Sequence, residues 1–200
     1  MNFAKHYYRK ARHYLAYIRW RRRGGGIPVP GLVKQRRILK LAKQYHCSTF
    51  VETGTFHGEM VESVYKHFQR VLSVELLESL FEENKARFRG IRNISLFHGK
   101  SEQVLPEMIR HIQGQALFWL DAHYSGPGTG GKDNHCPILL ELDAIRQARE
   151  RKDCLVVDDA RCFDGTDGYP SRDFLEKAIR KINPSYKIYL ENDALIAVPS

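Results

Sequence analysis

Three acidic residues directly follow runs of apolar residues that have the character of buried strands. The stretch ALFWLD ends in Asp121, and CLVVDD ends in Asp158 and Asp159. Neighbouring parallel strands end at the same edge of a sheet, so these carboxylates are expected to lie close together. Carboxylates in close contact repel one another, and a hard divalent cation relieves this repulsion by taking their oxygens as ligands. The pattern predicts a divalent-cation site formed by these three residues.

Each of these residues also has an ordinary structural role open to it. Asp121 could cap a helix or form a salt bridge, and the acidic pair could be a polar exit from its strand. His123 lies two residues after Asp121, and free histidine has the near-neutral pKa that suits a general base. It could equally be a hydrogen-bonded loop histidine. Arg161 could face an anionic ligand, or pair with Asp158 or Asp159 if no metal is present.

A second group of residues suggests a nucleoside ligand. The turn VETGTFHGE contains Glu52, Thr53, Gly54 and Gly58, and its glycines would let the backbone approach a ligand closely. Its spacing differs from the G-x-G-x-x-G of dinucleotide-binding proteins. Glu75 ends the next apolar run, where a carboxylate can accept both ribose hydroxyls. Glu75 could instead be a favourable charge at a helix N-terminus.

Alternating strand and helix patterns position these residues. Pro137 marks a helix start, and the last two strands are separated so briefly that they must form an antiparallel hairpin. This order predicts an α/β fold, a Rossmann-like doubly wound sheet that is mostly parallel. Helices are expected at 33–46, around 60–68, after residue 77, at 137–151 and at 171–182, and strands at 48–53, 70–75, 93–99, 116–121, 154–159, 186–192 and 194–200.

The positive charge is concentrated at one end of the chain. Eight of the 32 lysines and arginines lie in residues 1–23 with no acid, so the remaining residues hold 24 bases against 23 acids. We expect residues 1–23 to form a basic amphipathic helix, with residues 24–31 a Gly/Pro linker and residues 32–200 a single domain. The four cysteines lack C-x-x-C spacing and are interpreted as reduced thiols of a cytoplasmic protein.

The combination of Glu52, Gly54, Gly58 and Glu75 with a terminal hairpin resembles the class I S-adenosylmethionine (SAM)-dependent methyltransferases, over about residues 33–200. The resemblance implies that the glycine turn, including Thr53, holds the methionine part of SAM, and that Glu75 holds its ribose. The stretch HGKSEQVLPEM lies where the family contacts adenine, which implies roles for Gly99, Lys100 and Ser101.

The acidic residues resemble those of one branch of that family, the metal-dependent sugar O-methyltransferases of the macrocin O-methyltransferase type. There, three acids hold Mg²⁺ and a nearby residue is the general base, which corresponds to Asp121, Asp158, Asp159 and His123 here. This chain is shorter and carries a glycine-rich insert, HYSGPGTGGKDNHC, that is expected to form a lid with Tyr124, Lys132, Asp133 and His135 as acceptor contacts. The acceptor specificity of those enzymes therefore does not transfer.

The sequence is compatible with three functions. It favours an O-methyltransferase for a sugar or other small hydroxylated acceptor. A nucleic-acid (RNA) methyltransferase is disfavoured because the body is nearly neutral and carries D-A-H-Y where amino-directed enzymes have N/D-P-P-Y. A non-catalytic SAM-binding protein is the third. We expect residues 3–23 to attach the enzyme to an anionic membrane surface at the inner face, although a solvated or partner-docking arm is also open.

Overall fold

The computed structural model describes residues 3–121, 136–148 and 152–200, with the backbone alone over residues 3–10. Seven strands form one sheet in the order β3-β2-β1-β4-β5-β7-β6. The pairs β3-β2, β2-β1, β1-β4 and β4-β5 are parallel, whereas β7 runs antiparallel to both β5 and β6. The predicted Rossmann-like α/β fold with a terminal hairpin is confirmed. The strands are β1 Thr49–Thr53, β2 Arg70–Glu75, β3 Ile94–His98, β4 Ala116–Leu120, β5 Cys154–Val157, β6 Lys187–Glu191 and β7 Ala194–Val198.

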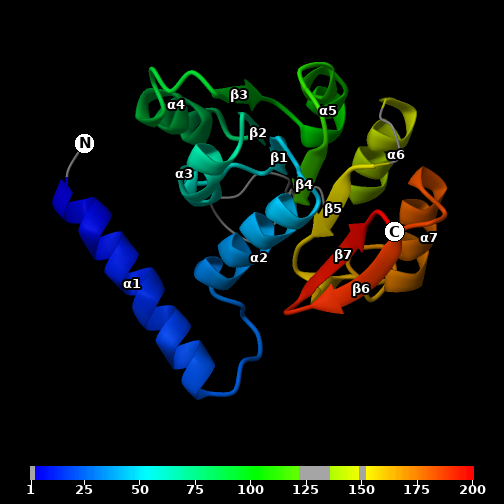
Figure 1. The fold of residues 1–200 in the computed structure, drawn as a ribbon, viewed down its shortest axis with the longest axis horizontal. Helices are drawn as coiled ribbons and strands as arrows, with labels where there is room; N and C mark the ends of the chain where they lie inside the picture. Colours follow the sequence, from blue (N-terminus) through cyan, green and yellow to red (C-terminus); the bar gives the residue numbers. More distant parts are fainter. Residues whose placement is uncertain (1–2, 122–135, 149–151) are drawn as a thin grey trace.

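Helices cover both faces of this sheet (Figure 1). One apolar cluster packs α5, α6 and α7 against one face, and a second packs α2, α3 and α4 against the other. Successive residues of a strand point to opposite faces, so Phe50 belongs to the second cluster and Val51 to the first. The helices are α1 Phe3–Arg22, α2 Gly31–Gln44, α3 Glu59–Val64, α4 Glu78–Arg87, α5 Ser101–Arg110, α6 Ile138–Ala148 and α7 Arg172–Ile182, with short 3₁₀ turns at Tyr65–His67 and Ala160–Cys162.

The helix α5 was not among the elements expected from the sequence, which assigned that stretch only to adenine contacts. Pro106 lies inside it and removes one backbone donor, so the sequence does not read as a helix there. Burial of Leu105, Met108 and Ile109 in the core nevertheless holds α5 against the sheet. The helix also provides the crossover that two parallel strands, β3 and β4, require.

The basic helix α1 extends along one side of the domain and approaches α2 (Figure 1). On its inner side the His13 imidazole lies 3.2 Å from the Glu59 carboxylate, and the Arg36 guanidinium lies 4.7 Å from the Tyr17 ring. Tyr14 and Leu15 on another side are more than half exposed. Among the described residues, no helix combines the length and the apolar character needed to span a membrane.

The turn between β1 and α3 requires glycine at position 58 for a packing reason. Gly58 precedes α3 with φ +66°, and a Cβ there would meet the Asn84 side chain and lie 2.8 Å from the Phe88 ring. Asn84 cannot withdraw easily, because its amide donates to the carbonyl of Phe56 at 2.6 Å and to that of Leu80 at 2.9 Å. The Asn84 side chain, which belongs to α4, thus fixes the shape of the turn.

We expect Gly58→Ala to destabilise the protein by about 1–3 kcal/mol more than Gly90→Ala, because only the first substitution overpacks the core. Gly90 is a matched control, since it also has positive φ (+84°) but nothing lies within 4 Å of a Cβ there. Urea denaturation of the two variants measures the difference. Equal losses of unfolding free energy would show that backbone conformation alone selects glycine at position 58.

Candidate active site

The register of three parallel strands places the acidic residues at one edge. Thr53 pairs with Leu120, and Leu120 pairs with Val157, so β1, β4 and β5 end side by side. The pairing continues one residue further, because the Asp121 N–H donates to the carbonyl of Thr53 at 3.2 Å and the Asp158 N–H to that of Leu120 at 3.1 Å. Both aspartates therefore occupy fixed positions just past the strands.

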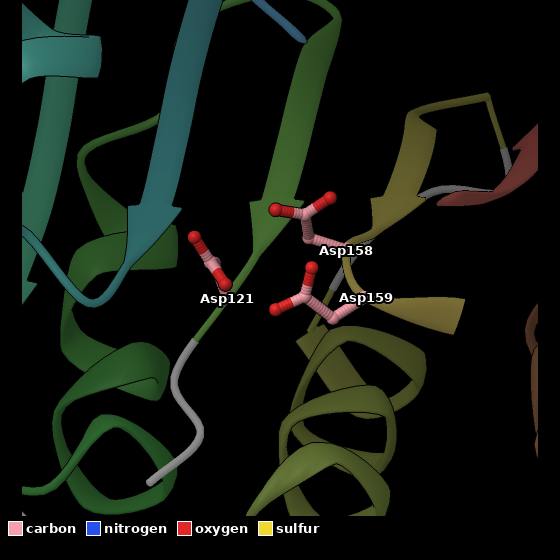
Figure 2. Close-up of side chains that lie close together, drawn as sticks. All are labelled: Asp121, Asp158 and Asp159. Atoms are coloured by element: carbon pink, nitrogen blue, oxygen red, sulfur yellow. The ribbon is translucent and has the colours of Figure 1, made fainter. Parts of the chain in front are cut away.

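The carboxylates of Asp121, Asp158 and Asp159 meet at this edge (Figure 2). One oxygen from each lies within 4.8 Å of the other two. Asp159 has φ +50°, a left-handed conformation that aspartate tolerates better than most residues, and the chain turns there into the 3₁₀ segment Ala160–Cys162. The three groups thus gather as the strand ends led us to expect, whereas metal binding by them stays a prediction.

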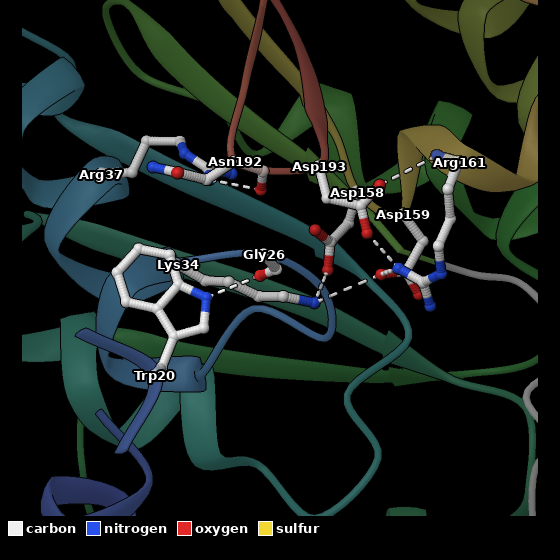
Figure 3. A network of polar contacts seen from close by, with 9 residues as sticks. All are labelled: Trp20, Gly26, Lys34, Arg37, Asp158, Asp159, Arg161, Asn192 and Asp193. Atoms are coloured by element: carbon white, nitrogen blue, oxygen red, sulfur yellow. Dashed lines mark hydrogen bonds and ion pairs between the residues drawn. The ribbon is translucent and has the colours of Figure 1, made fainter. Parts of the chain in front are cut away.

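Two basic side chains compensate the acidic cluster (Figure 3). The Lys34 ammonium, from α2, forms an ion pair with Asp158 and lies 3.5 Å from an oxygen of Asp159. Arg161 donates to Asp159 at 2.7 Å and also pairs with Asp193 in the β6–β7 turn. Burial alone would lower the pKa of Lys34, but the neighbouring negative charges of Asp158, Asp159 and Asp121 raise it, so the lysine is charged at neutral pH.

The donor set suits a divalent cation. Carboxylate oxygens are the ligands that Mg²⁺ prefers. Asp158 is 1% exposed, and its Oδ1 atom has no hydrogen-bond partner in the part of the chain that the structure describes. An orphaned, buried carboxylate oxygen beside two further carboxylates fits a cation ligand. Lys34 bonds to the other oxygen of Asp158.

Lys34 was missed by the sequence reasoning, although helical periodicity contains the signal. The buried residues of α2 are Arg37, Ile38, Leu41 and Ala42, and Lys34 precedes Ile38 by one helical turn. Two basic residues therefore lie on the face of α2 that packs against the domain. A base on an apolar helix face indicates a buried acid opposite it, which here is Asp158.

On the neighbouring strands, Glu75 connects two turns. Its Oε2 accepts from the Phe56 N–H at 2.7 Å in the turn after β1, and its Oε1 accepts from the Leu77 N–H at 2.9 Å before α4. In the first turn, Gly54 has φ +92° and its N–H donates to the Val74 carbonyl at 3.0 Å. The glycine turn is thus tied to the end of β2 by both backbone and carboxylate.

Glu52 lies beneath this turn. It is 2% exposed, and the Ser73 hydroxyl donates to its Oε2 at 2.6 Å. Burial raises the pKa of Glu52 to about 8, against the opposing effect of the Ser73 hydrogen bond. The residue is therefore largely protonated at neutral pH, and its carboxyl group can donate as well as accept a hydrogen bond.

A second buried carboxyl group, Glu141 on α6, was also missed. It is 1% exposed and accepts hydrogen bonds from the hydroxyls of Ser101 and Thr53. Burial raises its pKa to about 7, an effect that those two hydrogen bonds oppose. Glu141 lies one turn from Ile138 and from Ile145 on the buried face of α6, so periodicity again carries the signal.

The remaining predicted site residues differ in where they lie: some are buried, one is exposed, and others fall outside the described residues. Thr53 and Ser101 are buried with their hydroxyls directed to Glu141, while Lys100 is exposed immediately before α5. The Gly99 N–H donates to the Glu75 carbonyl at 2.9 Å, which joins the end of β3 to that of β2. The expected base His123 lies outside the described residues, as do the lid residues Tyr124, Lys132, Asp133 and His135.

Comparison with solved structures identifies the fold. The O-methyltransferase TomG from Streptomyces achromogenes, involved in tomaymycin synthesis and solved with SAM, aligns over 94% of this chain and 89% of its own at 14% identity and a TM-score of 0.58. An O-methyltransferase from Bacillus cereus, solved with S-adenosylhomocysteine (SAH), aligns over 84% and 81% at 12% identity and a TM-score of 0.56.

An N-methyltransferase has the same architecture. NodS from Bradyrhizobium japonicum WM9 aligns over 84% of this chain and 95% of its own at 13% identity and a TM-score of 0.53. Neither a family model nor a curated protein sequence matches the chain. The similarities are structural at low identity, and they establish that this chain has the fold of SAM-dependent methyltransferases.

The two buried carboxyl groups make stability depend on pH. Their pKa values are about 8 for Glu52 and about 7 for Glu141 in the folded protein, against an ordinary value of 4.5. The folded state therefore binds more protons, so the stability that these groups contribute is complete below about pH 4.5 and is lost as the pH rises to about 8.

We expect Glu141→Gln to flatten the decline in unfolding free energy between about pH 5 and about pH 8, because the amide stays neutral throughout. Urea denaturation across this range measures the slope, with Glu83→Gln as the exposed control. Parallel pH profiles for wild type and Glu141→Gln would mean that Glu141 is already ionised in the folded protein at pH 5.

Proposed function

We propose that this protein is a SAM-dependent O-methyltransferase for a sugar or other small hydroxylated acceptor. One observation carries the proposal: a glycine turn tied to Glu75 and a cluster of three aspartates lie on the same edge of a methyltransferase-type sheet. The first group suits a nucleoside cofactor, and the second suits hydroxyl groups bound through a cation. The glycine turn follows β1, and β1 is the direct neighbour of β4, which leads to Asp121, so the two sites adjoin.

The cofactor half of the proposal rests on Glu75 and the turn. Each oxygen of Glu75 accepts one backbone N–H and keeps a further lone pair, so the carboxylate can also accept from ribose hydroxyls. Gly54, with Glu52 and Thr53 beneath it, would lie against the methionine part of SAM. Gly58 shapes this turn, and Lys100 and Ser101 at the end of β3 would border the adenine. Bound SAM supplies a methyl group on a positively charged sulfur.

The acceptor half rests on the aspartates. Asp121, Asp158 and Asp159 would hold a divalent cation, Mg²⁺ in our proposal, and such an ion lowers the pKa of an acceptor hydroxyl. Asp121 is the member nearest in sequence to His123, to which we assign removal of the acceptor's proton. The aspartates would fix the acceptor's position, and His123 would leave its oxygen ready to accept the methyl group.

A membrane role for residues 3–23 extends the proposal. Arg12, Arg19 and Arg21–Arg23 are exposed, and Tyr14 and Leu15 are 56% and 54% exposed. Exposed bases beside an aromatic and an aliphatic side chain suit an anionic lipid surface. Trp20 has a different role, because its indole N–H donates to the Gly26 carbonyl at 2.6 Å and thereby fastens the linker to α1. Attachment would bring the enzyme close to lipid-linked glycans.

We expect Glu75→Gln to weaken SAM binding roughly ten- to hundredfold, because the amide loses charge-assisted hydrogen bonds to the ribose. Glu78→Gln, an exposed acid in the first turn of α4, should bind SAM like wild type. Titration calorimetry measures both, and mass spectrometry of reactions with deoxysugars and glycolipids detects methyl transfer. If SAM binds neither wild type nor Glu78→Gln, the proposed activity is wrong.

We expect the full chain to sediment with anionic vesicles at low salt and to be released as salt rises, because its attachment is largely electrostatic. Changing Arg21, Arg22 and Arg23 together to Glu should abolish this sedimentation, whereas the same change at the exposed Lys40, Lys43 and Arg89 should not. Equal sedimentation of both triple variants, or preferential binding of wild type to RNA, would contradict a membrane role.

A further inference from the structure

Lys34 occupies a position that neither the sequence nor the methyltransferase fold assigns. It lies in the first turn of α2, just after the Pro30 that precedes the helix. Its side chain is 19% exposed, and its ammonium lies 5.9 Å from the centre of the Trp119 ring. From there it reaches across to the loop after β5 and pairs with Asp158 (Figure 3).

The ammonium contacts the same carboxylates that form the candidate cation site. Its nitrogen bonds to Asp158 Oδ2 and lies 3.5 Å from Asp159 Oδ1, while Asp121 also contributes to its electrostatic environment. Arg161 binds the outer side of Asp159 and is held there by Asp193. Of the two basic side chains that pair with the aspartates, Lys34 is the less exposed, at 19% against 40% for Arg161.

The buried side of Asp158 supplies an independent observation. Its side chain is fully buried, and Oδ1 has no hydrogen-bond partner among the described residues, although Oδ2 is engaged by Lys34. Lys34 thus bonds only to Oδ2, and the buried Arg37 adds positive charge near Asp158 without a hydrogen bond to Oδ1. Burying a carboxylate oxygen without a hydrogen-bond partner is costly, so Oδ1 is able to take a further cationic ligand.

We infer that Lys34 is a built-in competitor for the divalent cation, holding Asp158 and Asp159 until a metal ion displaces its ammonium. This inference rests on the proposed function for the identity of the site. Two cations that need the same oxygens cannot both take them, and they repel strongly at such short separation in a partly buried site. The wild-type protein should therefore bind divalent cations weakly.

Movement of Lys34 does not require movement of its helix. Three residues further along α2, Arg37 donates to the Asn192 carbonyl at 2.9 Å and lies 3.7 Å from the Glu191 carboxylate. These contacts anchor α2 to the β6–β7 turn independently of Lys34. The lysine has a flexible four-carbon chain and partial exposure, so its ammonium can leave Asp158 by rotation of the side chain.

The first experiment measures metal affinity directly. Electron paramagnetic resonance titration with Mn²⁺ should give a roughly tenfold or greater gain in affinity for Lys34→Met over wild type, because the competing charge is gone. Lys34→Arg should bind as weakly as wild type, and Lys40→Met, an exposed lysine on the same helix, should leave the affinity unchanged. Adding Asp158→Asn to Lys34→Met should remove the gain.

A second experiment uses wild type alone and covers the case in which Lys34→Met does not fold. Acetylation by acetic anhydride, followed by peptide mass spectrometry, should label Lys34 several-fold faster when Mn²⁺ is present, while Lys40 is unaffected. Equal Mn²⁺ affinity of folded wild type and Lys34→Met, undetectable Mn²⁺ binding by both, or unchanged labelling of Lys34 at saturating Mn²⁺ would each overturn the inference. SAM calorimetry on the same samples separates this failure from failure of the proposed methyltransferase activity.

Discussion

The candidate site depends on compensating the charge of one buried aspartate. Asp158 follows the interior strand β5 and has no exposed side-chain surface, so an ionised carboxylate there requires a cation close by. Lys34 meets this requirement from a helix more than a hundred residues away in the chain. Lys34 can reach Asp158 only when α2 packs on the sheet. The packing of α2 and the charge balance of the acids therefore depend on each other.

Much of this arrangement follows from the sequence. Strands end in parallel at one edge, so placing Asp121, Asp158 and Asp159 together needed only the strand boundaries and their neighbour relations. The same reasoning could not supply Lys34 or Glu141, because their partners lie on other elements and become adjacent only when helices pack on the sheet. The sequence was also insufficient for α5, where core burial outweighs the local effect of Pro106.

The glycine turn illustrates a different limit. Gly54 and Gly58 looked alike as residues that permit close approach of a ligand, yet Gly58 has a steric reason in Asn84 and Phe88. Packing therefore explains one of the two glycines, and a ligand-facing role for Gly54 stays a prediction. The shared fold has a corresponding limit, since it supports both O- and N-methyltransferases among the compared structures. Any preference for an oxygen acceptor has to come from the side chains at the edge of this sheet.

The strand order has a consequence for synthesis on the ribosome. The hairpin strand β6 joins the sheet only through β7, which lies between it and β5. As the nascent chain emerges, β6 leaves the exit tunnel before the strand that must seat it, and so does Arg161 before its partner Asp193. Asp121, Asp158 and Asp159 therefore emerge early, whereas the last residue of their contact network, Asp193, emerges late. Until β7 is inserted, β5 is an open sheet edge, and an open edge can pair with another chain.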